Sequence, residues 1–281
     1  MHRLALTAAL LMPVVIDGAL IAEATKAVPE VLVAESKSTE KEELGLDDID
    51  SLTEEVEKAE EAGEYQQAID ILEQILTIEK KELGPEHAEV GGTLSWLGSI
   101  YADQRLYVKA ETHLFRGLAI LEKALGTEHQ HTLVVLREMG ELYEEQGLYN
   151  KAEKLYLRLV VIREKVLGKD HLETSYAINS LAGMYTNQGL YSKAEPLYMR
   201  ALVIAETVLG TQHQGTATVL KNLGSLYEIQ DLYSKAENFY LRALAINEND
   251  LGPDNPDTAS SLDKLADLYF FQHLYNKAEP F

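Results

Sequence analysis

The stretch "QGLYNKAEKLYLRLVVIREKVLGKDH", residues 146–171, decides the fold of this chain. Its apolar and small residues recur every three or four positions, which is the spacing of one face of an α-helix. The pattern stops at Leu167-Gly168, and a glycine just after the last periodic residue is typical of a helix C-terminus. The stretch therefore predicts one amphipathic helix, whose periodic residues are Tyr149, Ala152, Tyr156, Leu159, Ile162 and Val166.

Nearly the same letters return twice, as "QGLYSKAEPLYMRALVIAETVLGTQH" (residues 188–213) and "QDLYSKAENFYLRALAINENDLGPDN" (residues 230–255). The tyrosine that opens the helix recurs every 42 residues, as does an alanine three residues later. A fixed period of this length is the signature of a repeat architecture. The tyrosine column consists of Tyr65, Tyr107, Tyr149, Tyr191, Tyr233 and Tyr275.

Each unit also holds a shorter first helix, such as "TLVVLREMGELYEEQ" at residues 132–146. A column of small residues in this helix is placed where the paired helices must approach closely: Gly98, Gly140, Ala182, Gly224 and Ala266. One helical hairpin cannot bury its apolar stripe alone, so successive hairpins stack. The predicted fold is an all-α solenoid of antiparallel helix pairs, with five pairs and an incomplete sixth over residues 48–281.

The motifs "SLAGMYTNQGLYSKAEPLYMRAL" (residues 180–202) and "LGPDNPDTASSLDKLADLY" (residues 251–269) resemble the tetratricopeptide repeat. The likeness is closest to its 42-residue form, found in kinesin light chains and many bacterial proteins, and it covers residues 52–281. The resemblance implies a non-enzymatic interaction scaffold that binds a peptide or protein segment in a concave groove lined by the first helices.

The groove positions that this resemblance implies vary from repeat to repeat, while the columns expected in the core do not. Within one chain, that contrast is typical of a scaffold with a position-specific binding face. Kinesin light chains usually carry Asn-Asn in this part of the first helix, and this chain does not retain the pattern. The groove candidates are Asp103, Arg137, Glu141, Glu144, Glu145, Tyr176, Asn179, Asn187, Lys221, Glu228, Asp263 and Asp267.

Acidic residues predominate among these candidates, so the expected ligand is neutral or basic. The alternative for Glu141, Glu144 and Glu145 is an ordinary solvated helix face. Tyr176 is singled out because 14 of the 15 tyrosines fall in repeat columns, where they are expected in the core, and Tyr176 does not.

A histidine also recurs in register, at His87, His129, His171 and His213, and Asn255 is the fifth member of this column. Asn255 precedes Pro256, and this pair is typical of a helix N-cap followed by proline at the first helical position. A metal would need several ligands converging on one point, whereas these histidines are a whole repeat apart. Capping is therefore the favoured interpretation, and no metal site is predicted.

The composition excludes several function classes. There are 25 lysines and arginines against 46 acidic residues, and the net charge of −21 disfavours nucleic acid and anionic lipid surfaces. Cysteine is absent, which excludes disulfides and thiolate chemistry from this chain. We found no base, nucleophile and orienting group in a shared arrangement and no phosphate-binding glycine loop. No enzyme activity and no cofactor are predicted.

The N-terminal segment differs from the repeats. Arg3 precedes an apolar run over residues 4–16, and small residues follow near Ala24, which is typical of an export signal at residues 1–24. The alternatives to an export signal are an uncleaved membrane anchor and a cytoplasmic chain. Once an export signal is removed, no stable membrane insertion is expected. Residues 25–47 are expected to be a flexible acidic linker, since residues 23–64 hold 15 acidic residues and 4 lysines. The predicted location is periplasmic or extracellular.

The sixth repeat stops soon after Tyr275. One hypothesis is that the chain is the repeat part of a larger bacterial protein, for example one with a caspase-like peptidase domain, as in relatives of this type. Another is end-to-end self-association through the uncapped end, where Phe270, Phe271 and Phe281 lie.

Overall fold

A computed structural model of the chain describes residues 44–278. The predicted signal and most of the predicted linker lie outside this range. Residues 44–278 form helices and turns and contain no strand, which confirms the all-α prediction. The elements are η2 (Leu46–Asp48), α2 (Ile49–Glu61), α3 (Tyr65–Glu82), α4 (Ala88–Asp103), α5 (Tyr107–Ala124), α6 (Gln130–Glu145), α7 (Tyr149–Leu167), α8 (Leu172–Asn187), α9 (Tyr191–Val208), α10 (Gln214–Glu228), α11 (Tyr233–Leu251), α12 (Pro256–Phe271) and α13 (Tyr275–Ala278).

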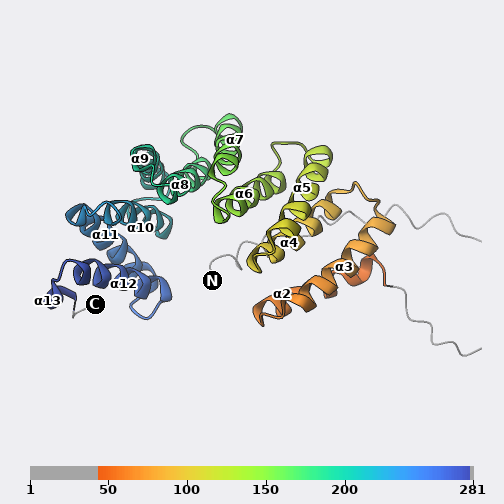
Figure 1. Cartoon of the computed structure of the whole chain (residues 1–281), viewed down its shortest axis with the longest axis horizontal. Coiled ribbons are helices and arrows are strands. Elements are labelled where there is room, and N and C mark those ends of the chain that lie inside the picture. The colour runs from red at the N-terminus through yellow and green to blue at the C-terminus, as the bar shows by residue number, and fades with distance from the viewer. Residues whose placement is uncertain (1–43, 279–281) are drawn as a thin grey trace, which may run out of the picture. The chain divides into compact units, whose positions relative to one another are not determined.

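The helices fall into two compact units that divide after Ala124. In the first unit, α2 packs on α3 and α4 on α5, and α3 also contacts α4. In the second unit the pairs are α6 with α7, α8 with α9, and α10 with α11, followed by α12 and the short α13. Within each unit the second helix of one pair packs on the first helix of the next, so the apolar interior is continuous, as in an α-solenoid (Figure 1).

Small residues set the close approach of the paired helices, as the sequence predicts. A Cβ atom added at Gly140 would lie 2.9 Å from Cε1 of Tyr156, and one added at Gly224 would lie 2.4 Å from Cε1 of Tyr240. Both tyrosine side chains are buried. Each glycine therefore gives room to the aromatic ring of the following helix, and a larger side chain would push the pair apart.

The tyrosine column that opens the second helices is less buried than predicted. Tyr65 is 38% exposed and Tyr275 is 54% exposed, and the members between them are partly exposed. Each of these tyrosines is the first residue of its helix, next to the hairpin turn, so protein covers only part of its ring. The tyrosine near the end of the first helix is buried as predicted, for example Tyr185 at 6% exposure.

The connection between repeats is built around the recurring histidine. At His171, Nδ1 accepts a hydrogen bond from the backbone N–H of Glu173, which caps α8. His87, His129 and His213 make the same bond, and Asn255 makes it through Oδ1, so the capping interpretation is confirmed. The loop before this cap turns at Gly168, where φ is 100°, and the hydroxyl of Thr174 donates to the Gly168 carbonyl at 2.8 Å.

A tyrosine, a glutamate and a lysine join successive pairs in the second unit. The Tyr185 hydroxyl donates to Glu153 of the preceding second helix at 2.5 Å, and Lys193 lies 3.4 Å from the same carboxylate and over the Tyr185 ring. Burial and this hydrogen bond raise the pKa of Tyr185 to about 12. The arrangement recurs at Tyr269, Glu237 and Lys277. These contacts link neighbouring repeats of the second unit.

Candidate functional site

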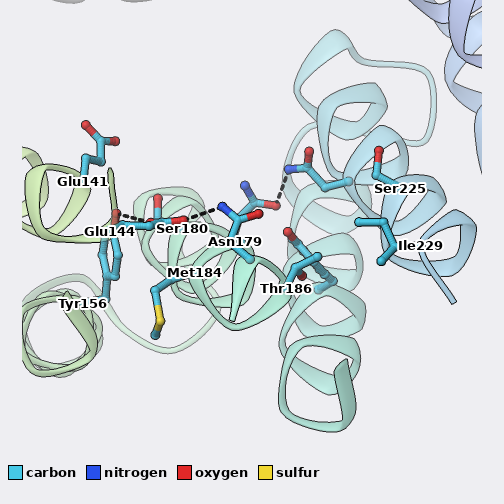
Figure 2. Close-up of a pocket in the computed structure, with 13 residues that line it drawn as sticks. Glu141, Glu144, Tyr156, Asn179, Ser180, Met184, Thr186, Ser225 and Ile229 are labelled. Carbon is cyan, nitrogen blue, oxygen red and sulfur yellow. Dashed lines mark hydrogen bonds between the residues drawn. The ribbon is translucent and has the colours of Figure 1, made fainter. Parts of the chain in front are cut away.

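A pocket of about 350 Å³ lies on the first helices of the second unit (Figure 2). Figure 2 shows Glu141, Glu144 and Tyr156 along one side, Asn179 and Ser180 of α8 in the middle, and Ser225 and Ile229 on the other side. The repeat stacking places α6, α8 and α10 side by side, so three consecutive first helices supply most of the lining. The lining consists of Glu141, Glu144, Tyr156, Asn179, Ser180, Gly183, Met184, Thr186, Asn187, Tyr198, Asn222, Ser225 and Ile229.

Two asparagines join α8 to α10 across the pocket. Nδ2 of Asn222 donates to Oδ1 of Asn179 at 3.0 Å. Because each amide side chain offers two N–H donors and two acceptor lone pairs, this bond leaves further donors and acceptors on both residues. The pair therefore presents the same combination of groups as a peptide bond.

Glu144 joins α6 to α7 and α8. Its Oε1 accepts from Nδ2 of Asn187 at 2.6 Å, and its Oε2 accepts from the Tyr156 hydroxyl at 3.0 Å. Burial raises the pKa of the Glu144 carboxyl, and the charges of Glu141 and Glu145 act in the same direction. The two hydrogen bonds oppose this rise without removing it.

Glu141 has a different partner. Nη1 of Arg137 lies 2.5 Å from Oε1 of Glu141, one helical turn along α6. Burial disfavours the charged guanidinium, but Glu141 and Glu138 outweigh this effect and raise the pKa of Arg137 above its ordinary value. Arg137 thus compensates Glu141 at the edge of the pocket without lining the pocket itself.

The structure brings four of the predicted groove residues together in the pocket: Glu141, Glu144, Asn179 and Asn187. Arg137 adjoins them through Glu141. Asp103 belongs to the other unit. Six further candidates belong to the second unit but do not line the pocket: Glu145, Tyr176, Lys221, Glu228, Asp263 and Asp267.

Several of these six have neighbours of their own. Lys221 lies 3.8 Å from Asp257 of the next first helix. Glu228 accepts a 2.5 Å hydrogen bond from the Tyr240 hydroxyl. Tyr176 is 42% exposed on α8. These residues occupy the same helix faces as the pocket residues, but they do not converge with them.

The groove candidates predicted from the sequence lack the polar Asn222 and the small and apolar part of the lining. Gly183 and Thr186 stand one period after Glu141 and Glu144, and Tyr198 stands one period after Tyr156. The 42-residue step could therefore have found them. They were passed over because a glycine, a threonine and a tyrosine expected in the core offer no obvious binding chemistry.

Three other properties considered from the sequence concern features outside the pocket. Phe270 and Phe271 are 58% and 62% exposed, and Phe281 lies outside the described residues, so self-association through this end stays a prediction. Over residues 44–278, the structure gathers no three histidine, aspartate or glutamate side chains that could hold a metal ion. None of the helices described is long and apolar enough to cross a membrane.

Comparison with known families decides the identity of the fold. The model for the tetratricopeptide repeat matches residues 89–165, 174–249 and 229–281, which together make up more than half of the chain. The chain belongs to the tetratricopeptide repeat family. A search of the curated proteins gives no match.

Several solved structures share this fold. BtubC (BKLC) from P. vanneervenii aligns with a TM-score of 0.62 and 20% identity over 82% of this chain and 87% of that one. A putative kinesin light chain with TPR-like repeats from Podosopora anserina aligns with a TM-score of 0.62 and 24% identity over 72% of this chain and 96% of that one.

A third structure, aspartyl phosphate phosphatase F from Bacillus subtilis, aligns with a TM-score of 0.60 and 16% identity over 87% of this chain and 63% of that one. At these identities the likeness shows the fold alone. The resemblance to the tetratricopeptide repeat is confirmed by the family model, and a putative kinesin light chain is among the solved structures that share the fold.

Proposed function

We propose that this chain is a non-enzymatic scaffold that binds an extended peptide segment of a partner protein in the pocket formed by α6, α8 and α10. The observation that carries the proposal is the Asn179–Asn222 pair, which spans two first helices inside a pocket of about 350 Å³. Its remaining amide donors and acceptors match those of a peptide main chain.

Binding suits this pocket better than catalysis. Two polar groups of the lining are hydrogen-bonded to tyrosine hydroxyls, Glu144 to that of Tyr156 and Ser225 to that of Tyr240. General acid–base or nucleophilic chemistry needs a base within hydrogen-bond reach of a nucleophile, with a third group to orient the base. The lining instead offers amide and hydroxyl groups, which favour recognition of a main chain.

The partner segment is neutral or basic. The lining holds two carboxylates, Glu141 and Glu144, and neither lysine nor arginine. An acidic segment would bring like charges together in a partly desolvated pocket, which costs free energy. We also propose that the scaffold works outside the cytoplasm, which rests on the sequence pattern of residues 1–24 alone.

Selection from peptide libraries tests this function. The immobilised full chain is screened with acidic, neutral and basic ten-residue libraries at low and physiological salt. The tightest binders are then measured on the double variant Asn179→Ala with Asn222→Ala, and we expect at least a tenfold loss of affinity. Asn150→Ala, an exposed asparagine of α7, is the matched control and should bind as the unaltered chain does.

Two results would contradict the proposal. The first is that no library gives a binder whose affinity depends on Asn179 and Asn222. The second is preferential selection of acidic peptides, which would overturn the assigned charge preference.

A further inference from the structure

Glu144 differs from the other carboxylate of the pocket in how its charge is compensated. Glu141 has the guanidinium of Arg137 at 2.5 Å. The hydrogen-bond donors to Glu144 are the amide of Asn187 and the hydroxyl of Tyr156, and both are neutral. Burial of a carboxylate without a cation is costly, because neutral donors replace only part of the lost hydration. The pocket is therefore built with one negative charge that the chain does not neutralise there.

The surroundings of Glu144 add to this imbalance. Glu141 and Glu145 on its own helix repel it, and they act together with burial to raise the pKa of its carboxyl. From the packed helices, Tyr156 of α7 and Asn187 of α8 donate hydrogen bonds, and the hydroxyl of Tyr198 on α9 interacts electrostatically with it. A cation placed against this carboxylate would offset both the repulsion and the desolvation.

The carboxylate keeps capacity for such a ligand. Each carboxylate oxygen can accept about two hydrogen bonds, and each oxygen of Glu144 accepts one from the protein. Serine hydroxyls and asparagine carbonyls around the pocket offer more acceptors. A guanidinium carries five N–H donors in a planar fork, so it uses several acceptors at once, whereas an ammonium is a compact charge with three donors.

We propose that the pocket receives a cationic side chain of the bound peptide segment, preferably arginine, with Glu144 as its charge partner. This inference rests on the proposed function, because the cation belongs to the peptide whose main chain meets Asn179 and Asn222. It makes Glu144 the residue that determines specificity, while Tyr156 and Asn187 are positioning residues that hold its carboxylate.

Blocked amino acids test the pocket without a known partner. The probes are N-acetyl-arginine methylamide, its lysine and glutamate counterparts, and the citrulline counterpart, which has nearly the shape of arginine but no charge. Binding to the full chain is followed by NMR through the side-chain amide signals of Asn187 and Asn179. We expect the arginine probe to shift these signals at concentrations at least tenfold lower than the citrulline probe, with lysine between them.

Variants assign the effect to Glu144. Glu144→Gln should reduce the affinity for the arginine probe to that for citrulline, because the amide oxygen can keep one hydrogen bond but carries no charge. Glu228→Gln is the matched control: this residue stands two repeats later, accepts from Tyr240 as Glu144 does from Tyr156, and does not line the pocket. It should retain the preference for arginine.

Proton binding gives an independent readout. A cation stabilises the ionised form of Glu144, so the affinity for the arginine probe should fall severalfold as the pH is lowered and the carboxyl becomes protonated. This pH dependence should be lost in Glu144→Gln and kept in Glu228→Gln.

The inference is overturned if the citrulline probe binds the unaltered chain as tightly as the arginine probe does. It is also overturned if Glu144→Gln and Glu228→Gln lower the affinity for the arginine probe equally, since that would indicate general charge attraction. Peptides that depend on Asn179 and Asn222 but show no preference for a cation would overturn this inference and leave the proposed function standing. Peptide binding that does not depend on the two asparagines would contradict the proposed function itself.

Discussion

The interior of the helix pairs and the pocket on the first helices differ in how far their residues repeat along the sequence. In the interior a small residue faces an aromatic ring at equivalent positions of different repeats, as with Gly140 against Tyr156 and, two periods later, Gly224 against Tyr240. In the pocket the residues change at each repeat, so that Glu144 is followed one period later by Thr186 and two periods later by Glu228. Repetition therefore marks the residues that hold the repeats together, and variation marks the face available for recognition.

The largest expected effect is in the interior. In Gly224→Leu, even the first added carbon would lie 2.4 Å from Cε1 of the buried Tyr240, so the helices must separate. We expect the free energy of unfolding to fall by about 3 kcal/mol or more. Chemical denaturation of the full chain measures it.

Gly92→Ala is the control for this substitution. No atom lies within 4 Å of an added Cβ at Gly92, so alanine should stabilise α4 slightly through its higher helix propensity. An unchanged denaturation midpoint in Gly224→Leu would show that the helix-pair packing described here is wrong.

The second effect concerns an interior position that does not follow the repetition. Glu79 is 4% exposed; its Oε1 accepts from the Thr93 hydroxyl at 2.9 Å, and its Oε2 is buried without a hydrogen-bond partner. One period later the same position is Leu121. Burial raises the pKa of Glu79 from 4.5 to about 7, and the Thr93 hydrogen bond only partly opposes the rise.

The sign of the pH dependence follows from this shift. Well below pH 4.5 the carboxyl is protonated whether the chain is folded or unfolded. As the pH rises towards 7, the unfolded chain releases this proton first, so stability falls. Relative to Glu79→Gln, the unaltered chain should lose about 3 kcal/mol between acidic and mildly alkaline pH. Parallel pH profiles of the two proteins would contradict the burial of an ionisable group at this position.

A smaller effect is expected at the helix caps. His171→Ala removes the acceptor for the Glu173 N–H and should cost about 1 kcal/mol, seen as faster hydrogen exchange in the first turn of α8. His171→Asn should be nearly neutral, because Asn255 caps α12 in the same way. A similar loss in both variants would mean that the histidine acts through packing and not through its cap.

The smallest effect on stability belongs to the pocket. Asn222→Ala removes one hydrogen bond between partly exposed side chains, so the free energy of unfolding should fall by only about 0.5 kcal/mol. Thermal unfolding measures the change, and Asn150→Ala is the control. A loss of stability as large as that in Gly224→Leu would show that Asn222 is a structural residue and would contradict the distinction between interior and pocket.

The sequence predicted the helices better than it predicted what each side chain touches. The 42-residue step located every helix pair, because apolar periodicity and glycine caps are local signals. It overestimated the burial of Tyr149 and its equivalents, since repetition marks a position without saying whether other helices cover it. Burial depends on the neighbouring repeat, which the periodicity of one helix does not describe.

The contacts in the pocket could not be predicted from the sequence for a related reason. Neighbouring first helices pair side chains 43 residues apart, as in Glu144 with Asn187 and Asn179 with Asn222. This offset is one residue more than the period. Alignment by the period alone sets Glu144 beside Thr186 and hides its hydrogen bond to Asn187. The offset arises from the stagger of stacked helices, which only the three-dimensional arrangement reveals.

The most direct test of the account asks where a selected peptide lies. Because the chain has no cysteine, single cysteines can be introduced at Ser180 in the pocket and at Ser192, an exposed position on the second helix α9, with no competing thiol. A peptide taken from the library selection and carrying a thiol-reactive group is then cross-linked to each variant. The account predicts efficient cross-linking to Ser180→Cys and little to Ser192→Cys; equal or reversed yields would contradict binding in the first-helix pocket.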